Sequence, residues 1–341
     1  MKRFELLRPD GLGTASQALL DDERAVARGA GIDLLDHLKA GLSEPSALVE
    51  LRRIPGEAGE TLRGIAVRSD DPAHIELGSL VTLSQLAEAE TLAGPHAALR
   101  RAASEAATPS IRNMATLGGN LLQRPRCWYY RDPELRCLKK GGDMCLAIGG
   151  DSRYHAILGG GPSWAVHPSS LGAALVALNA RVRIHGVGTT TDGVRELPIE
   201  ELFAPPSEDP KREHRLARGE ILTAVLLPKA AGDHRSAYRA AREKQSHDWP
   251  LAEAAVSLEM VQGKMTKVRV GLGHVAPIPW RATEAEAVLE GRAPSTDLFA
   301  EAAEAALAPA SALAGNAYKI PLTRGLIRHV LHEASGVPTP A

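Results

Sequence analysis

The chain has 341 residues, of which 40 are Lys or Arg and 41 are Asp or Glu, so its formal net charge is −1. This length predicts two domains, and the balanced charge excludes the basic surface of a dedicated nucleic-acid-binding protein. A hydrophobic fraction of 44% excludes a disordered chain.

The first fifty residues alternate short strand and helix patterns. Residues 25–27 are apolar and favour a strand, whereas the leucines of residues 33–39 have helical spacing. Gly29 and Gly31 lie in the connection between them. A glycine-containing turn from a strand into a helix brings backbone N–H groups close to a phosphate, which the helix dipole favours. A plain strand-to-helix turn is the alternative interpretation.

Residues 61–106 predict two strands followed by two helices. The strands lie at 62–67 and 74–78, and the first helix begins at Leu83, where Thr82 and Gln85 fit a capping box. The second helix covers about residues 95–106.

A polar motif follows these helices. Thr116, Gly118, Gly119 and Asn120 place a hydroxyl, bare backbone amides and a carboxamide within five positions. These groups suit a polar cofactor that approaches the backbone closely. The alternative is a tight turn between strands.

The remaining patterns complete the first domain and then predict a second, smaller α+β domain. A helix at 171–178 opens after His167–Pro168–Ser169–Ser170, and strands follow at 181–184 and 221–228. The proline and glycine of the segment 228–236 predict a domain boundary there. Beyond it, we expect strands at 252–260, 267–272 and 278–282, and helices at 285–289, 298–307 and 322–331.

Taken together, these motifs resemble the FAD-binding (medium) subunits of the molybdenum hydroxylases, the family of xanthine dehydrogenase, carbon monoxide dehydrogenase and aldehyde oxidoreductase. The resemblance covers nearly the whole chain, and its most specific block is Ile111–Asn120. Further matching segments are 29–34, 165–169, 220–222, 275–281 and 315–319. The implied fold is α+β: a two-subdomain FAD-binding domain of the molybdopterin dehydrogenase type, followed by a small α+β domain.

The resemblance implies an FAD site and a domain division. The segment from Ala27 to Leu34 would wrap the pyrophosphate, and Thr116 to Asn120 would meet the flavin and ribityl chain. The implied cofactor-binding residues are Ala27, Arg28, Gly29, Ala30, Gly31, Ile32, Asp33, Leu34, Thr108, Thr116, Gly118, Gly119, Asn120, Ser170, Leu222 and Arg239. The FAD-binding domain would span residues 1–228, with a subdomain split near 55–60, and a carbon monoxide dehydrogenase flavoprotein C-terminal-like domain would span 236–337.

Three positions depart from the family pattern. Members often carry Asp at the position of Ser170 and a lysine near Arg239 or Ala240, and Ile32 replaces a common hydroxyl residue of the phosphate loop.

His167 precedes a proline at a helix start, which favours a structural role over a catalytic one. By its position in the family pattern, Trp249 is expected to lie near the flavin ring. A tryptophan packed in the core is the alternative interpretation.

The cysteines cluster in an insertion at residues 124–160. Cys127, Cys137 and Cys145 lie within nineteen residues, and similar insertions in some family members hold a [4Fe–4S] cluster, which normally needs four thiolates. Trp164 stands where a fourth cysteine is expected, so His155, Asp151, a water or a partner's residue would complete the ligands. A [4Fe–4S] cluster, an insertion that has lost its cluster, and a zinc site all stay open.

The resemblance implies an electron-transfer subunit rather than a complete enzyme. A molybdopterin-binding large subunit would oxidise the substrate, and a [2Fe–2S] small subunit would relay electrons to FAD, in a heterotrimer or a dimer of heterotrimers. A stand-alone flavin-dependent oxidoreductase is the alternative. No secretion signal or membrane span is recognisable, so we expect a cytoplasmic protein, or a periplasmic one exported with a signal-bearing partner.

Overall fold

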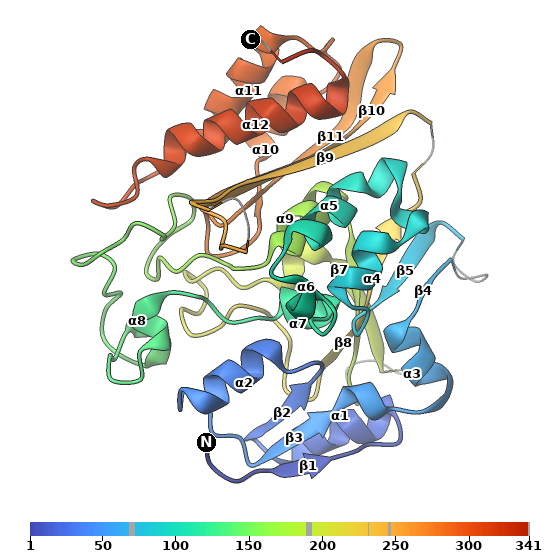
Figure 1. Ribbon diagram of the computed structural model, residues 1–341, viewed down its shortest axis with the longest axis vertical. Coiled ribbons are helices and arrows are strands. Elements are labelled where there is room, and N and C mark those ends of the chain that lie inside the picture. The colour runs from blue at the N-terminus through green and yellow to red at the C-terminus, as the bar shows by residue number, and fades with distance from the viewer. Residues whose placement is uncertain (68–71, 189–192, 231, 245–246, 340–341) are drawn as a thin grey trace.

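The computed structural model describes residues 1–67, 72–188, 193–230, 232–244 and 247–339. Three sheets form successive layers along its long axis, from the N-terminal sheet at the bottom of Figure 1 to the C-terminal sheet and its helices at the top. Ala231, within the predicted domain boundary, lies outside the described residues.

The N-terminal layer is a small parallel sheet of β1 (Glu5–Leu7), β3 (Ala47–Glu50) and β2 (Ala25–Arg28), in that order. Parallel strands need crossover connections, which α1 (Leu12–Asp21) and α2 (Ile32–Lys39) supply. The predicted strand at 25–27 and helix at 33–39 are therefore confirmed as β2 and α2.

The middle layer is an antiparallel sheet in the order β4-β5-β8-β6-β7. Its strands are β4 (Ile65–Ala66), β5 (His74–Gly78), β6 (Arg181–His185), β7 (Val194–Pro198) and β8 (Ile221–Pro228). The helices of this part are α3 (Gly56–Arg63), α4 (Leu83–Glu88), α5 (Ala97–Glu105) and α9 (Ser170–Ala177). The capping box of Thr82 and Gln85 is present at α4.

The predicted strand at 62–67 is wrong in its first half. Leu62 and Arg63 end α3, and only Ile65–Ala66 pairs as a strand. Leu62 is buried on the inner side of this helix. A short run of apolar residues has the same pattern in a buried strand and in a buried helix end.

Short helical turns connect these elements. They are α6 (Pro109–Arg112), α7 (Leu117–Leu121), α8 (Trp128–Arg131), and the 3₁₀ turns Leu51–Arg53, Glu90–Leu92, Gly94–His96, Leu138–Lys140 and Ile199–Leu202. The Gly118–Gly119–Asn120 motif therefore lies in a helical turn and not in a turn between strands.

The C-terminal layer is an antiparallel sheet in the order β12-β11-β10-β9. Its strands are β9 (His234–Ala241), β10 (Ala252–Val261), β11 (Lys264–Gly273) and β12 (Trp280–Arg281), and its helices are α10 (Thr283–Leu289), α11 (Thr296–Leu307) and α12 (Lys319–Ser335). The prediction missed β9, because this strand begins with the polar residues His234, Arg235 and Ser236 next to the domain boundary.

Both faces of this sheet are covered. In β10, Ala254 and Val256 belong to the core shared with α10, α11 and α12, whereas Ala255 belongs to the core of the middle layer, where α5 and α9 pack on the sheet. This alternation follows from the two-residue period of a strand. Odd-numbered residues of β10, including Glu253, thus point toward the middle layer.

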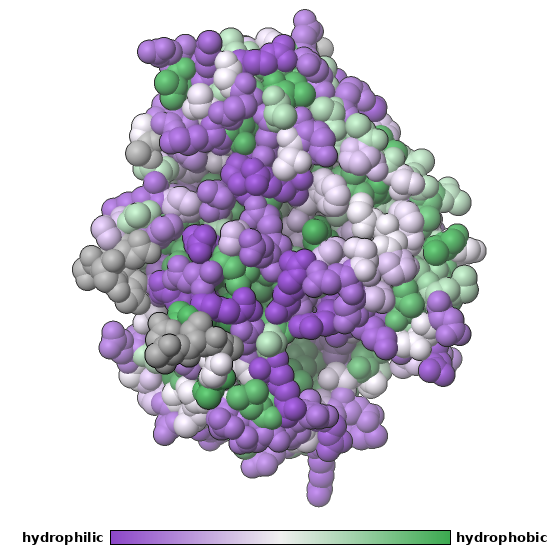
Figure 2. Space-filling model, turned by 180° about the vertical axis from the view of Figure 1, so that it is seen from behind, coloured by the Kyte–Doolittle hydropathy of each residue, from purple (hydrophilic) through white to green (hydrophobic). Residues whose placement is uncertain are grey.

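The predicted α+β class is confirmed. Among the described residues, no helix has the length and apolarity needed to cross a membrane. Figure 2 shows that the face opposite to that of Figure 1 is largely hydrophilic, with apolar residues in small groups.

Candidate functional site

A cavity of about 640 Å³ lies where the N-terminal layer, the middle layer and the β9–β10 connection meet. It brings together every predicted cofactor-binding residue except Arg239. These residues are Ala27, Arg28, Gly29, Ala30, Gly31, Ile32, Asp33, Leu34, Thr108, Thr116, Gly118, Gly119, Asn120, Ser170 and Leu222. Segments that are 195 positions apart in the chain, from Ala27 to Leu222, therefore face one space.

The connection from β2 to α2 forms one wall of the cavity. Gly31, the N-cap of α2, has φ 81°, and no side chain caps the first-turn N–H groups of this helix. A φ in this region favours glycine. Uncapped N–H groups at a helix N-terminus form a site for a phosphate, so this wall suits a pyrophosphate.

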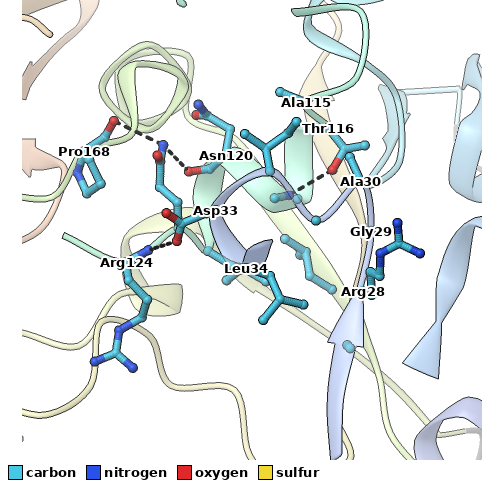
Figure 3. Close-up of a pocket in the computed structure, with 18 of the residues that line it drawn as sticks. Arg28, Gly29, Ala30, Asp33, Leu34, Ala115, Thr116, Asn120, Arg124 and Pro168 are labelled. Carbon is cyan, nitrogen blue, oxygen red and sulfur yellow. Dashed lines mark hydrogen bonds between the residues drawn. The ribbon is translucent and has the colours of Figure 1, made fainter. Parts of the chain in front are cut away.

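Gly29 makes a close approach to the opposite wall. A Cβ at this position would lie 3.3 Å from both Thr116 Oγ1 and Leu80 Cδ2. Figure 3 shows Gly29 and Ala30 beside Thr116. The absence of a side chain at Gly29 thus keeps the two walls in contact at the base of the cavity.

Asp33 is an anion in the first turn of α2, where a phosphate would also be held. Its carboxylate accepts a hydrogen bond from Arg131 Nη2 at 2.7 Å and from the Arg124 N–H at 2.8 Å, and Arg126 lies 3.2 Å away. Burial alone would raise the pKa of Asp33, but the Arg131 hydrogen bond and charge outweigh it and lower this pKa. The arginines neutralise the carboxylate and tie the insertion to the cavity wall.

The Thr116 turn forms the second wall. Thr116 Oγ1 accepts the Gly119 N–H at 3.2 Å, and the Gly118 N–H donates to the Ser79 carbonyl at 2.8 Å. A Cβ at Gly118 would lie 3.0 Å from the Ser79 Cβ. Asn120 Oδ1 accepts from the Ser169 hydroxyl at 2.6 Å, which joins this turn to the start of α9.

The structure places Arg239 outside the cavity. Its side chain points from β9 toward α12, where Nε donates to Glu333 at 2.8 Å. Arg242 lines the cavity instead and pairs with Glu105 at 3.1 Å. The sequence missed Arg242 because the face of a strand on which a side chain lies depends on its register, which no local pattern fixes.

Trp249 lies at the cavity wall and not in the core, since 46% of its surface is exposed. The Arg126 guanidinium stacks over its ring at 4.7 Å, a cation–π contact between the insertion and the C-terminal domain. His167, in contrast, is buried against Phe203 with ring centroids 4.8 Å apart. Burial lowers the pKa of His167 to about 3, so it is a neutral core residue.

The three cysteines line one small cavity of their own. Cys137 and Cys145 are buried, and burial raises the pKa of the Cys127 thiol to about 11. His155 Nε2 lies 3.2 Å from Cys127 Sγ, and Nδ1 of the same ring is buried without a hydrogen-bond partner in the described part of the chain. Burial lowers the pKa of His155 to about 4, so its imidazole is neutral and able to donate a lone pair.

The other expected ligands lie elsewhere. Asp151 is exposed and pairs with Arg153 at 2.7 Å, and Trp164 packs against Gly160. No three His, Cys, Asp or Glu side chains of the described residues surround a single metal-ion position. A zinc site requires such a grouping, whereas the thiolates of an iron–sulfur cluster each bind a different iron atom.

Tyr130 lines both the cysteine cavity and the larger cavity. Its hydroxyl lies 3.2 Å from His37 Nε2. Beside it, Lys139 and Arg124 each contact the buried Glu213 at 2.6 Å. These contacts were not predicted, since partners more than seventy positions apart leave no local signal.

This arrangement defines a dinucleotide-binding flavoprotein of α+β type. Residues 2–230 match the family described as "FAD binding domain in molybdopterin dehydrogenase", and residues 236–334 match the "CO dehydrogenase flavoprotein C-terminal domain". The chain belongs to the family of FAD-binding subunits of the molybdenum hydroxylases, and the resemblance seen in its motifs is confirmed.

Known relatives match over nearly their full length. The chain is 32% identical to the aldehyde oxidoreductase FAD-binding subunit PaoB of Escherichia coli, over 98% of this chain and 99% of that protein. It is 29% identical to the carbon monoxide dehydrogenase medium chain of Afipia carboxidovorans, over 97% and 96%. A solved carbon monoxide dehydrogenase from Oligotropha carboxidovorans superposes with a TM-score of 0.75 at 25% identity, covering 99% of each chain.

Proposed function

We propose that this protein is the electron-transfer subunit of a multisubunit molybdenum hydroxylase. A molybdopterin-binding large subunit oxidises the substrate, a [2Fe–2S] small subunit relays the electrons, and FAD on this chain passes them to an external acceptor. The relatives that match over nearly the whole chain are named as subunits of an aldehyde oxidoreductase and of carbon monoxide dehydrogenases. Their shared length supports the same division of labour here.

The observation that carries the proposal is Tyr130, which lines both the larger cavity and the cysteine cavity. Two redox groups held in these cavities would be separated by one side chain. Such proximity suits a relay and has no use in an enzyme that oxidises its substrate directly at the flavin.

FAD, when bound, supplies the chemistry of two-electron storage and one-electron release. In the proposed site, the N–H groups at the start of α2 hold the pyrophosphate. Gly118, Gly119 and Asn120 meet the flavin and ribityl chain. The remaining predicted lining residues, including Thr108, Ser170 and Leu222, complete the contacts.

We further propose that Cys127, Cys137 and Cys145 ligate a [4Fe–4S] cluster and that His155 is the fourth ligand. The donor types suit the group, since the three cysteines line one small cavity and His155 Nε2 lies 3.2 Å from the Cys127 sulfur. Of the residues considered as fourth ligand, only His155 lies next to a cysteine sulfur.

The domain division also stays part of the proposal. The FAD-binding domain covers residues 1–228, with two subdomains that divide near 55–60 and an insertion at 124–160. The C-terminal domain covers 236–337. The subunit assembles with its large and small partners as a heterotrimer or a dimer of heterotrimers.

Two measurements test the proposal. The assembly isolated through this chain is expected to contain FAD and molybdenum in equal amounts, whereas FAD without any molybdenum-containing partner would indicate a stand-alone flavin enzyme. The chain purified alone without oxygen is expected to hold about four iron atoms. Less than a tenth of an iron atom per chain would refute the cluster.

The role of His155 has its own test. His155→Cys is expected to retain the iron and change the EPR spectrum of the reduced cluster, because a thiolate replaces an imidazole at one iron. His155→Ala is expected to lose iron, while His329→Ala, on α12, keeps it. Wild-type iron content and spectra in both His155 variants would show that His155 is not a ligand.

A further inference from the structure

Glu253 is a buried acid that makes no ion pair with a Lys or Arg among the described residues, and it lies directly behind the wall of the flavin cavity. Its side chain has no exposed surface. Oε1 accepts hydrogen bonds from the Ser170 hydroxyl at 2.5 Å and from the Tyr238 hydroxyl at 2.6 Å. Ser170 itself lines the cavity, so one hydroxyl group connects this carboxyl to the cofactor space.

The second oxygen of Glu253 has no hydrogen-bond partner among the described residues. Oε2 faces Nε2 of His274, which is also unpartnered, across 3.8 Å. A carboxylate with an unpaired buried oxygen is costly, and protonation of that oxygen removes most of the cost. Oε2 is thus the position for a proton, while Oε1 keeps both hydroxyl donors.

The groups that face Glu253 set the balance between its two protonation states. Arg242 favours the carboxylate from the end of β9, and Glu105 of α5 opposes it, although these two residues are paired with each other. Burial and the charge of the nearby Lys319 lower the pKa of His274. Burial outweighs the hydroxyl hydrogen bonds and raises the pKa of Glu253 to about 7.

We propose that Glu253 is the redox-linked proton acceptor of the flavin cavity, a role that rests on the proposed function. FAD held in the cavity and reduced by two electrons would add negative charge there, which would favour protonation of the nearby Glu253 carboxylate. Glu253 would then take up one proton from solvent and become a neutral carboxylic acid, in addition to any proton bound by the flavin itself. It would release this proton when the flavin is reoxidised.

The test is a count of protons taken up when dithionite reduces the FAD-loaded protein in a weakly buffered solution. At pH 8, wild type is expected to take up more protons per FAD than Glu253→Gln, by up to about one. At pH 5.5 the difference is expected to vanish, because Glu253 is then protonated before reduction. Glu259→Gln, farther along the same strand where the carboxylate pairs with Lys267, is the matched control and behaves as wild type.

A second variant identifies the titrating group. Tyr238→Phe removes one hydrogen bond that favours the carboxylate, so the pH at which the extra proton uptake disappears is expected to shift upward. Equal uptake in wild type and Glu253→Gln at both pH values would overturn the inference, and so would an unshifted midpoint in Tyr238→Phe. The FAD absorbance of each sample separates these outcomes from loss of the cofactor, and the molybdenum content of the isolated assembly tests the proposed function separately.

Discussion

Replacement of Asp33 by Asn tests whether the insertion is held against the cofactor cavity by charge. The change removes the hydrogen bond from Arg131 Nη2 at 2.7 Å and the ion pair with Arg126 at 3.2 Å, while the Asn carbonyl still accepts the Arg124 N–H. A hydrogen bond to a charged group contributes about 1.5–3 kcal/mol. Because both arginine side chains are partly exposed and water replaces some of the loss, we expect destabilisation by about 2–3 kcal/mol.

Asp36→Asn is the matched control, on the same helix. Among the described residues, Asp36 pairs only with Arg126, and 60% of its side chain is exposed, so its removal is expected to cost less than about 1 kcal/mol. Urea unfolding of the FAD-loaded protein, followed by circular dichroism, measures both differences. Equal midpoints for the two variants would refute the argument that Asp33 anchors the insertion.

The difference in stability between wild type and Asp33→Asn is expected to depend on pH. The folded state lowers the pKa of Asp33, so its contribution to stability is complete above the pKa of the unfolded chain, about 3.9. It is lost as the pH falls through the lower pKa of the folded state. The gap between wild type and Asp33→Asn is therefore expected to be constant from pH 5 to 8 and to close below about pH 4.

Three further substitutions are expected to have separable effects. Gly118→Ala crowds the cavity wall and is expected to weaken FAD binding at least about tenfold, measured by equilibrium dialysis, whereas Gly13→Ala, with nothing near its Cβ, keeps wild-type affinity. His167→Gln removes a histidine that stays neutral in the folded state. The free energy of unfolding of wild type is expected to fall as the pH drops from 6.5 to 4.5, and in this variant the fall should be smaller by about 1.4 kcal/mol per pH unit. Arg239→Ala is expected to leave FAD affinity within twofold of wild type, and a stronger loss than in Arg242→Ala would contradict the positions of these residues.

Local chemistry explains why much of the cavity could be predicted from the sequence. Gly29 and Gly31 are required by a close approach and a left-handed turn, and Thr116 caps the helical turn that begins at Leu117. These constraints act within a few residues, so they leave a readable pattern. The helices of the C-terminal domain were predicted for the same reason, since their apolar spacing is periodic.

The rest of the site depends on contacts that the sequence does not encode locally. In the sequence, Glu253 is a polar residue in a mainly apolar strand, and nothing nearby indicates its role. Only the pairing of β10 with its neighbours places it behind Ser170. In the same way, Cys127 and His155 are 28 positions apart, and only the folded insertion brings them to 3.2 Å. Such long-range contacts decide which polar residues near a cofactor site take part in its chemistry.

The C-terminal domain contributes to the larger cavity. Arg242 and Trp249 of the β9–β10 connection line the cavity, and Glu253 of β10 provides the acceptor for the Ser170 hydroxyl. A fragment that ends at Pro228 would lose these groups and would expose the apolar faces of α5 and α9, which pack on the C-terminal sheet. Both the closure of the cavity and its supply of a buried proton site therefore require the two domains to be joined.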